Sequence, residues 1–276
     1  MDIASPLSGH RLPTCFIPHG AGPCFFMDWT PADTWTAMGK FLREYPQRLP
    51  QQPKAILLVS AHWCAPRFSV TSGERPGLIY DYHGFPEHTY ELRYPAPGHP
   101  GLAERVAGLL AQAGIEAEQD PARGFDHGMF IPLKVMFPEA AVPVVQLSLR
   151  HGLDPQEHLE MGRALAPLRD EGVLIVGSGM SFHNMRGYGD ARFGPIAEAF
   201  DAWLTEAVLA EPAQRAQMLM NWMQAPSAAL CHPAGGEEHL IPLLVTAGAA
   251  DQSVGRKVFS QPVMQTRLSA FEFTDK

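Results

Sequence analysis

The sequence predicts a single α/β domain with a central, mostly parallel or mixed β-sheet flanked by helices. Two continuous apolar runs, at residues 55–59 and 173–176, are typical of strands buried on both faces of a parallel sheet. Segments with helical patterning alternate with such runs, as helices and strands do in α/β folds. The 276 residues contain no internal repeat and no linker rich in glycine and serine, so we expect one domain over residues 1–276.

Strands are expected wherever short apolar runs rich in β-branched residues occur. These runs cover residues 15–18, 55–60, 68–71, 142–149, 173–176, 258–260 and 268–273. We expect the last two to close the sheet as an antiparallel pair.

Helices are expected between these runs, at residues 31–45, 99–113, 155–168, 194–210, 212–223 and 237–247. Thr30 and Asp154 are each followed by proline, which is the pattern of an N-cap and a first helical residue. Gly114 suits the end of a helix. Pro242 is expected to interrupt the last helix early.

The composition excludes several classes of partner. With 21 Lys and Arg against 29 Asp and Glu, the formal net charge is −8, which argues against nucleic acid and against adhesion to anionic membranes. No apolar run approaches the length of a membrane span. The cysteines at positions 15, 24, 64 and 231 form no CxxC pair, and residues 1–9 carry no signal-peptide pattern. We therefore expect free thiols and a cytoplasmic protein.

The histidines carry the main functional signal. His19, His62 and His183 each stand just beyond or at the end of an expected strand, and His127 lies in a short glycine-containing turn. Ligands of open α/β sheets bind outside the carboxyl ends of the strands, so these side chains can converge. A lone histidine in a loop is more often a hydrogen-bonded structural residue. Four of them beside glycines make a shared metal site an equally good interpretation.

The segment 232–239 adds His232, Glu237, Glu238 and His239 as candidate ligands. The glutamates would also be favourable at a helix N-terminus for electrostatic reasons alone. Imidazole suits iron, zinc, copper and nickel. Two histidines with a carboxylate suit non-haem Fe(II), and three histidines suit a hydrolytic zinc. Ligand type alone leaves these alternatives open.

Two other chemistries find little support. Residues 177–181 do not follow the G-x-S-x-G pattern of a nucleophile elbow, and residues 20–22 are not a G-x-G-x-x-G dinucleotide fingerprint.

Several motifs, taken together and in order, resemble the class III extradiol ring-cleaving dioxygenases (LigB-like), in the branch that includes the 4,5-DOPA dioxygenases. The matching stretches are residues 16–20, 58–63, 80–86, 94–98, 124–128, 143–148, 177–184 and 238–243. They extend from residue 16 to about residue 250, which is most of the chain.

The resemblance implies a metal-dependent enzyme that opens a catechol ring with O₂ to a muconic semialdehyde. It implies non-haem Fe(II), with Zn possible as the bound ion, held by His19, His62 and His239. It further implies that His183 is a catalytic base and that His127 faces the substrate. A glutamate replaces the third histidine in protocatechuate-type relatives, so Glu237 and Glu238 stay open as alternatives to His239.

An aromatic slot is expected beside the metal. Trp63, Tyr80, Phe85 and Phe182 lie near the motifs, and of these we predict that Trp63, Tyr80 and Phe182 bind the substrate. Core packing is the alternative role for each of them. The expected partners are a small catechol, DOPA-like, and O₂. A zinc hydrolase on the same histidines and a non-catalytic Memo-like interaction protein are the rival functions.

Overall fold

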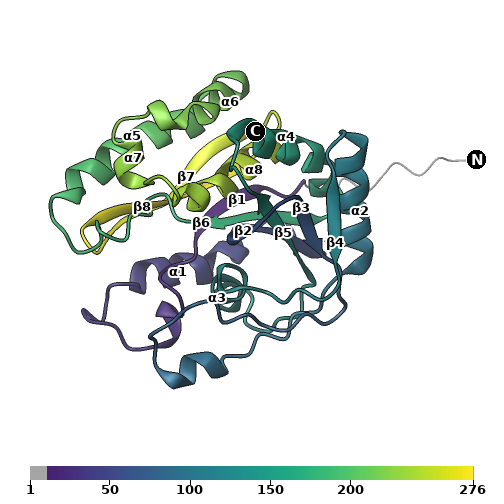
Figure 1. Cartoon of the computed structure of the whole chain (residues 1–276), viewed down its shortest axis with the longest axis horizontal. Helices are drawn as coiled ribbons and strands as arrows, with labels where there is room; N and C mark the ends of the chain where they lie inside the picture. The colour runs from purple at the N-terminus through teal and green to yellow at the C-terminus, as the bar shows by residue number, and fades with distance from the viewer. Residues whose placement is uncertain (1–10, 276) are drawn as a thin grey trace, which may run out of the picture.

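One eight-stranded mixed sheet organises the computed structural model, which describes residues 11–275 (Figure 1). The strands are β1 (Thr14–Pro18), β2 (Ala55–Ala65), β3 (Phe68–Thr71), β4 (Ala117–Asp120), β5 (Val144–Arg150), β6 (Val173–Gly179), β7 (Val254–Val263) and β8 (Thr266–Thr274). Their order is β4-β3-β5-β2-β6-β1-β8-β7. The central strands β5, β2, β6 and β1 are parallel, whereas β8 pairs antiparallel with both β1 and β7. The α/β class and the closing antiparallel pair are confirmed.

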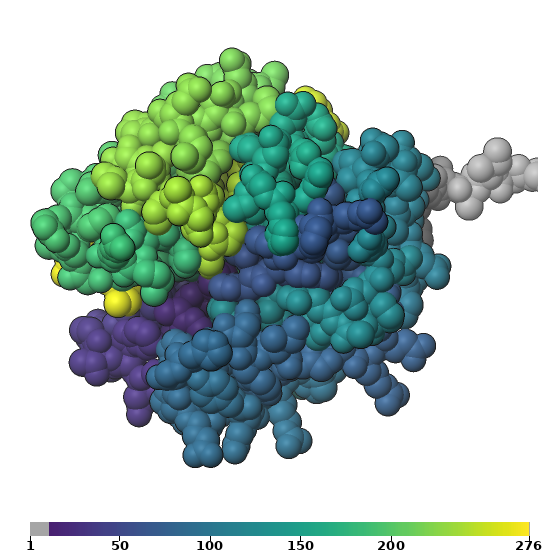
Figure 2. Space-filling view, viewed as in Figure 1, coloured from purple at the N-terminus to yellow at the C-terminus, as the bar shows by residue number. Residues whose placement is uncertain are grey.

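Helices cover both faces of the sheet. They are α1 (Thr36–Glu44), α2 (Pro100–Gln112), α3 (His127–Met136), α4 (Pro155–Leu165), α5 (Phe193–Leu209), α6 (Pro212–Met220), α7 (Ala228–Cys231) and α8 (Ile241–Ala249). One apolar core joins the sheet to α2, α4 and α8, and a second joins it to α1, α3 and α5. Figure 1 shows α1 and α3 on the opposite side of the central strands from α4 and α8. Figure 2 shows the C-terminal segments, in green and yellow, packed directly against the N-terminal half.

Several predictions of secondary structure were wrong. The first helix begins at Thr36 rather than at residue 31. Strand β4 was missed because its sequence, Ala-Glu-Gln-Asp, is polar and lies partly exposed at the sheet edge. Helix α3 was missed because nine of its ten residues are buried, so it has no amphipathic period, and because Pro132 lies inside it.

Pro242 begins a helix instead of interrupting one. The predicted helix at 237–247 is a 3-10 segment, η6 (Glu237–His239), followed by α8, in whose first turn Pro242 lies. Proline is tolerated there because the amide it lacks would have had no partner within the helix.

The expectation about a signal peptide in residues 1–9 lies outside the described residues, as do the ends of the expected domain at 1–10 and 276. Within residues 11–275, no helix is both long and apolar enough to cross a bilayer.

Strand register brings the ends of β1 and β6 level with Ser60, the last residue of β2 that pairs with β6. Pro18 lies opposite Gly179, and Ser60 lies opposite Ser178. Since these strands are parallel, residues just beyond this level emerge at the same edge of the sheet.

Two glycines in β6 let a distant segment approach the same edge. A Cβ atom at Gly179 would lie 2.1 Å from the carbonyl oxygen of His239, and one at Gly177 would lie 2.5 Å from that of Pro242. The Met180 amide donates to the His239 carbonyl at 2.9 Å. The segment that joins η6 to α8 therefore rests directly on the backbone of β6.

We expect Gly179→Ala to lower the free energy of unfolding by about 1–3 kcal/mol, because its new methyl group must displace the His239 backbone. Gly108→Ala is the control, since a Cβ at Gly108 in α2 meets nothing within 4 Å. Urea denaturation of both variants checks this. Equal stability of the two variants would contradict the packing account.

Candidate metal centre

Three imidazole rings meet beyond the level where β1, β2 and β6 align. His19 follows β1 directly, His62 lies near the end of β2, and His239 is the last residue of η6. One ring nitrogen from each lies within 4.8 Å of the others. The Nε2 atoms of His19 and His62 are 3.2 Å apart. These three side chains are therefore placed to share one ion.

The opposite ring nitrogens of two of these histidines are already engaged. His19 Nδ1 lies 2.9 Å from the Gly20 carbonyl oxygen, and His239 Nδ1 lies 2.7 Å from Glu238 Oε1. Because both oxygens accept, each Nδ1 donates a proton and each Nε2 keeps its lone pair. An oxygen acceptor behind the ring is the usual arrangement of a metal-ligating histidine.

The donor set fits a cation. His239 Nε2 is buried and has no hydrogen-bond partner among residues 11–275. Burial, followed by the nearby histidines, lowers the pKa of His19 and of His239 well below the ordinary value and that of His62 to about 3. The rings are therefore neutral at pH 7. Buried neutral imidazoles with an unpaired nitrogen are what a divalent transition metal requires.

The two glutamates lie elsewhere. Glu238 stands behind the His239 ring and accepts its proton. The Glu237 carboxylate is on the exposed side and accepts from the Gly235 amide at 2.7 Å. The third ring nitrogen that lies close to those of His19 and His62 is that of His239, so neither glutamate takes this position.

Asp81 is a site residue that the sequence reasoning did not single out. Its Oδ1 accepts from both the backbone amide and Nδ1 of His127, at 2.9 and 2.8 Å, and its Oδ2 faces His62 Nδ1 at 3.8 Å. Burial raises the pKa of Asp81, but the hydrogen bonds and charge of His127 outweigh it and lower the pKa. The signal that could have found Asp81 was its position in the motif at residues 80–86.

A network of buried hydrogen bonds fixes the backbone at His62 and next to His127. Ser60 Oγ accepts from the His62 amide at 3.1 Å and donates to Asp126 Oδ1 at 2.7 Å. Arg123 contacts the other oxygen of Asp126 at 3.3 Å. Since Asp126 directly precedes His127, one carboxylate ties the end of β2 to the start of α3.

His183 stacks on His239. Their ring centroids are 3.4 Å apart and the rings are nearly parallel, at 14°. The His183 amide donates to the Cys231 carbonyl, which fixes the loop that follows β6. Burial lowers the pKa of His183 to about 4, so this ring is also neutral at pH 7.

A cavity of about 590 Å³ opens over these rings. Its polar lining comprises His19, His62, Asp81, His83, His127, His183 and His239. Its apolar lining comprises Ala21, Trp29, Trp35, Tyr82, Phe85, Met180, Met185, Tyr188 and Met264, and Gly20 and Gly22 complete it. A single aromatic ring fits this volume with room for a substituent.

The three aromatic residues predicted to bind substrate do not line this cavity. Trp63 points to the other face of β2 from His62, because side chains alternate along a strand, and Arg123 covers its ring at 4.3 Å. Tyr80 donates its hydroxyl to the Leu92 carbonyl at 2.5 Å. Phe182 is buried against Tyr188 and Phe193. Of the four aromatic residues first considered, Phe85 is the one in the lining.

The comparisons with known proteins agree with this geometry. Residues 13–271 match the family model described as the catalytic LigB subunit of aromatic ring-opening dioxygenase. The chain is 41% identical over 244 residues to a 4,5-DOPA dioxygenase extradiol of Beta vulgaris, covering 87% of each chain. It is 36% identical over 260 residues to the protein of that name from Escherichia coli, covering 93% of this chain and 91% of the other. An uncharacterized Escherichia coli K12 protein of known crystal structure matches with a TM-score of 0.75 and 32% identity, covering 95% and 99%.

The chain belongs to the LigB family of aromatic ring-opening dioxygenases. It is a metal-dependent extradiol dioxygenase, and the predicted resemblance is confirmed. Membership of this family supports a ring-opening dioxygenase rather than the rival zinc hydrolase or interaction protein.

Glu238→Gln should weaken metal binding by about ten- to a hundred-fold, because the amide is a poorer acceptor for the His239 Nδ1 proton. Glu237→Gln is the matched control, since that side chain accepts from the Gly235 amide on the exposed side. Titration of metal-depleted protein with Zn²⁺ measures both. Equal loss in the two variants would refute the assigned role of Glu238.

Proposed function

We propose that this enzyme cleaves the ring of a catechol with one side chain, DOPA-like, to a muconic semialdehyde. Non-haem Fe(II) held by His19, His62 and His239 is the proposed cofactor. The observation that supports this best is the meeting of three neutral imidazoles, one of them with a buried Nε2 that has no hydrogen-bond partner within the part of the chain that the structure describes. The catechol and O₂ are the proposed partners.

A ferrous ion in this position would acidify the catechol hydroxyls and bring the diol and O₂ together, as metal ions and proximity do in general. Zn²⁺ suits the same nitrogens and binds N/O sites more tightly than Fe²⁺, although it has no redox chemistry. Bound zinc would therefore not contradict an iron enzyme.

His183 is the proposed general base. Its ring lies in the cavity lining, stacked on His239, and is neutral at pH 7 because burial lowers its pKa to about 4. It can accept a proton from a catechol hydroxyl, and the imidazolium formed lies 3.8 Å from Glu238 Oε1, which would stabilise it.

His127 is the proposed proton donor or hydrogen-bond partner on the other side of the ring. Asp81 accepts a hydrogen bond from His127 Nδ1, so the Nε2 atom is the one available to the substrate. The Asp81 carboxylate fixes the orientation of the His127 ring, as an orienting carboxylate does for a catalytic histidine.

The four cysteines are free thiols in the structure. This supports the proposed cytoplasmic location, where thiols stay reduced.

Protein reconstituted with Fe(II) should consume O₂ and a catechol in equal amounts and form a yellow product. Without O₂ the catechol should persist, and His239→Ala protein should bind little metal and show no turnover. An oxygen electrode and an absorbance scan over a small catechol panel check this. Catechol consumption in the absence of O₂ would contradict the proposal.

His183→Gln should lower kcat by about a hundred-fold or more, since a general base is removed. Its metal content should stay near that of the unaltered protein, because three other imidazoles hold the ion. Metal analysis beside the kinetics separates the two effects. Full activity in this variant would assign the base elsewhere.

A further inference from the structure

We propose that His83 binds the carboxylate of the substrate's side chain at the mouth of the active-site cavity. This assignment rests on the catechol-cleaving function proposed above and concerns the substituents that this function accepts. The observation that carries it is the position of His83 in the cavity lining, where it is exposed. Its ring makes no hydrogen bond or ion pair with any of residues 11–275.

The cavity has a buried end and an open end. His19 and His239 are buried, whereas His83 and Met185 are the two exposed residues of the lining and therefore mark its mouth. A catechol whose hydroxyls reach the buried imidazoles directs a substituent on the far side of its ring towards this mouth. Of the two residues there, His83 is the polar one.

The other ionisable side chains of the lining already have roles at the buried end. Three of them are the proposed metal ligands, and His183 stacks on one of these, His239. Asp81 accepts from His127 Nδ1 at 2.8 Å. None of these groups is placed to receive the far end of the substrate.

The hydroxyl groups of the lining are also engaged. Tyr188 donates to the Phe182 carbonyl at 2.7 Å, and Tyr82 donates to the Thr89 carbonyl at 2.5 Å. Among residues 11–275, no lysine or arginine contributes to the lining. His83 is therefore the free side chain at the mouth that can carry a positive charge.

The loop that carries His83 is fixed on both sides of it. The Tyr90 hydroxyl donates to the Tyr82 carbonyl at 3.3 Å and accepts from the Phe85 amide at 3.4 Å. The Phe85 ring packs on Gly22, where a Cβ atom would lie 2.9 Å from it. This contact holds the loop against the turn that follows β1, so that the imidazole of His83 is presented at the cavity mouth.

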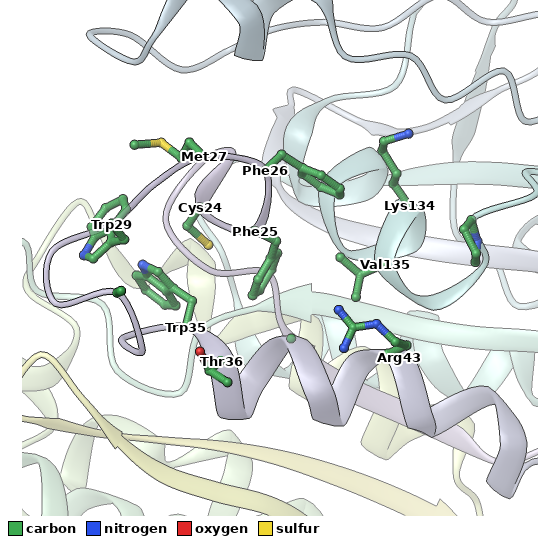
Figure 3. Close-up of a pocket in the computed structure, with 13 residues that line it drawn as sticks. Cys24, Phe25, Phe26, Met27, Trp29, Trp35, Thr36, Arg43, Lys134 and Val135 are labelled. Atoms are coloured by element: carbon green, nitrogen blue, oxygen red, sulfur yellow. The ribbon is translucent and has the colours of Figure 1, made fainter.

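The nearest cationic side chains face another space. Arg43 and Lys134 line a neighbouring hollow of about 410 Å³. Figure 3 shows both of them on the opposite side of this hollow from Trp29 and Trp35, which belong to both linings. Lys134 Nζ already donates to the Arg93 carbonyl at 3.0 Å. These cations therefore do not replace His83 as the partner of a carboxylate in the active-site cavity.

The strength of the contact follows from its exposure. An imidazole offers an N–H donor in either protonation state, and its hydrogen bond to a carboxylate is stronger when the ring is charged. Because His83 is exposed, water screens the pair, and we expect a contribution of about three- to ten-fold in affinity.

The test compares 3-(3,4-dihydroxyphenyl)propanoate with its methyl ester, which share a skeleton and differ in charge. In Fe(II)-reconstituted His83→Ala protein, kcat/KM for the acid should fall by about three- to ten-fold, whereas that for the ester should change little. DOPA should respond as the acid does. The kcat for the acid should stay near that of the unaltered protein, because a contact far from the reacting atoms binds substrate and transition state equally.

An unchanged kcat/KM for the acid, or an equal fall for acid and ester, would overturn the inference while leaving the catechol-cleaving function intact. No turnover of any catechol by the unaltered protein would overturn both.

Charge reversal at the same position sharpens the test. His83→Glu should lower the acid-to-ester ratio of kcat/KM further than His83→Ala, because it places a like charge at the mouth. His151→Glu makes the same change at an exposed histidine outside the lining and should leave the ratio unaltered. Trp29→Phe removes a neutral N–H donor of the lining and should also leave it unaltered. A fall in either control equal to that in His83→Glu would overturn the assignment.

A binding measurement without turnover completes the test. In Zn²⁺-loaded protein, the acid should quench tryptophan fluorescence at about three- to ten-fold lower concentration in the unaltered protein than in His83→Ala, since Trp29 and Trp35 line the cavity. The ester should bind both proteins equally. Equal affinity of both proteins for the acid would contradict the proposal independently of catalysis.

Discussion

The structure depends on one electrostatic constraint: three uncharged imidazole rings, two of them buried and that of His62 half-buried, lie with their nitrogen atoms converging. Burial removes the rings from water, and their proximity forbids protonation, so each pKa falls below its ordinary value. Without a shared cation, His239 Nε2 would lack any partner among the described residues, which costs free energy in a folded protein. A shared cation would therefore stabilise this site, and the oxygens of Gly20 and Glu238 orient the rings of His19 and His239.

The fold meets this constraint through backbone geometry. Parallel register brings the ends of β1 and β2 to the level of Gly179 in β6, and the absence of a side chain at Gly179 admits the backbone of His239. A residue more than two hundred positions from His19 is placed beside it in this way. The chemistry at this edge of the sheet therefore depends on packing between the segment before α8 and β6.

Sequence patterns predicted the sheet, most helices and the histidines that meet, because apolar runs and strand-end positions are local signals. Sequence reasoning passed over Asp81 although it lies in the motif at residues 80–86, because its role depends on a contact with His127 across the chain. It also misplaced the aromatic slot. Trp63 adjoins His62 in sequence but points to the opposite face of β2, whereas Tyr82, Trp29 and Met264 reach the cavity through loop paths that no local pattern encodes. Helix α3 escaped notice for a related reason, since full burial removes amphipathic periodicity.

X-ray absorption spectroscopy of protein loaded with one equivalent of Zn²⁺ tests the central claim most directly. Three imidazole nitrogens at about 2 Å from the ion are expected, together with oxygen ligands in the remaining positions. Replacement of His19, His62 or His239 by alanine should lower the amount of Zn²⁺ bound and remove one imidazole from the shell of the ion that stays bound. An imidazole count that does not change in these variants, or a metal shell made of oxygen alone, would contradict the account.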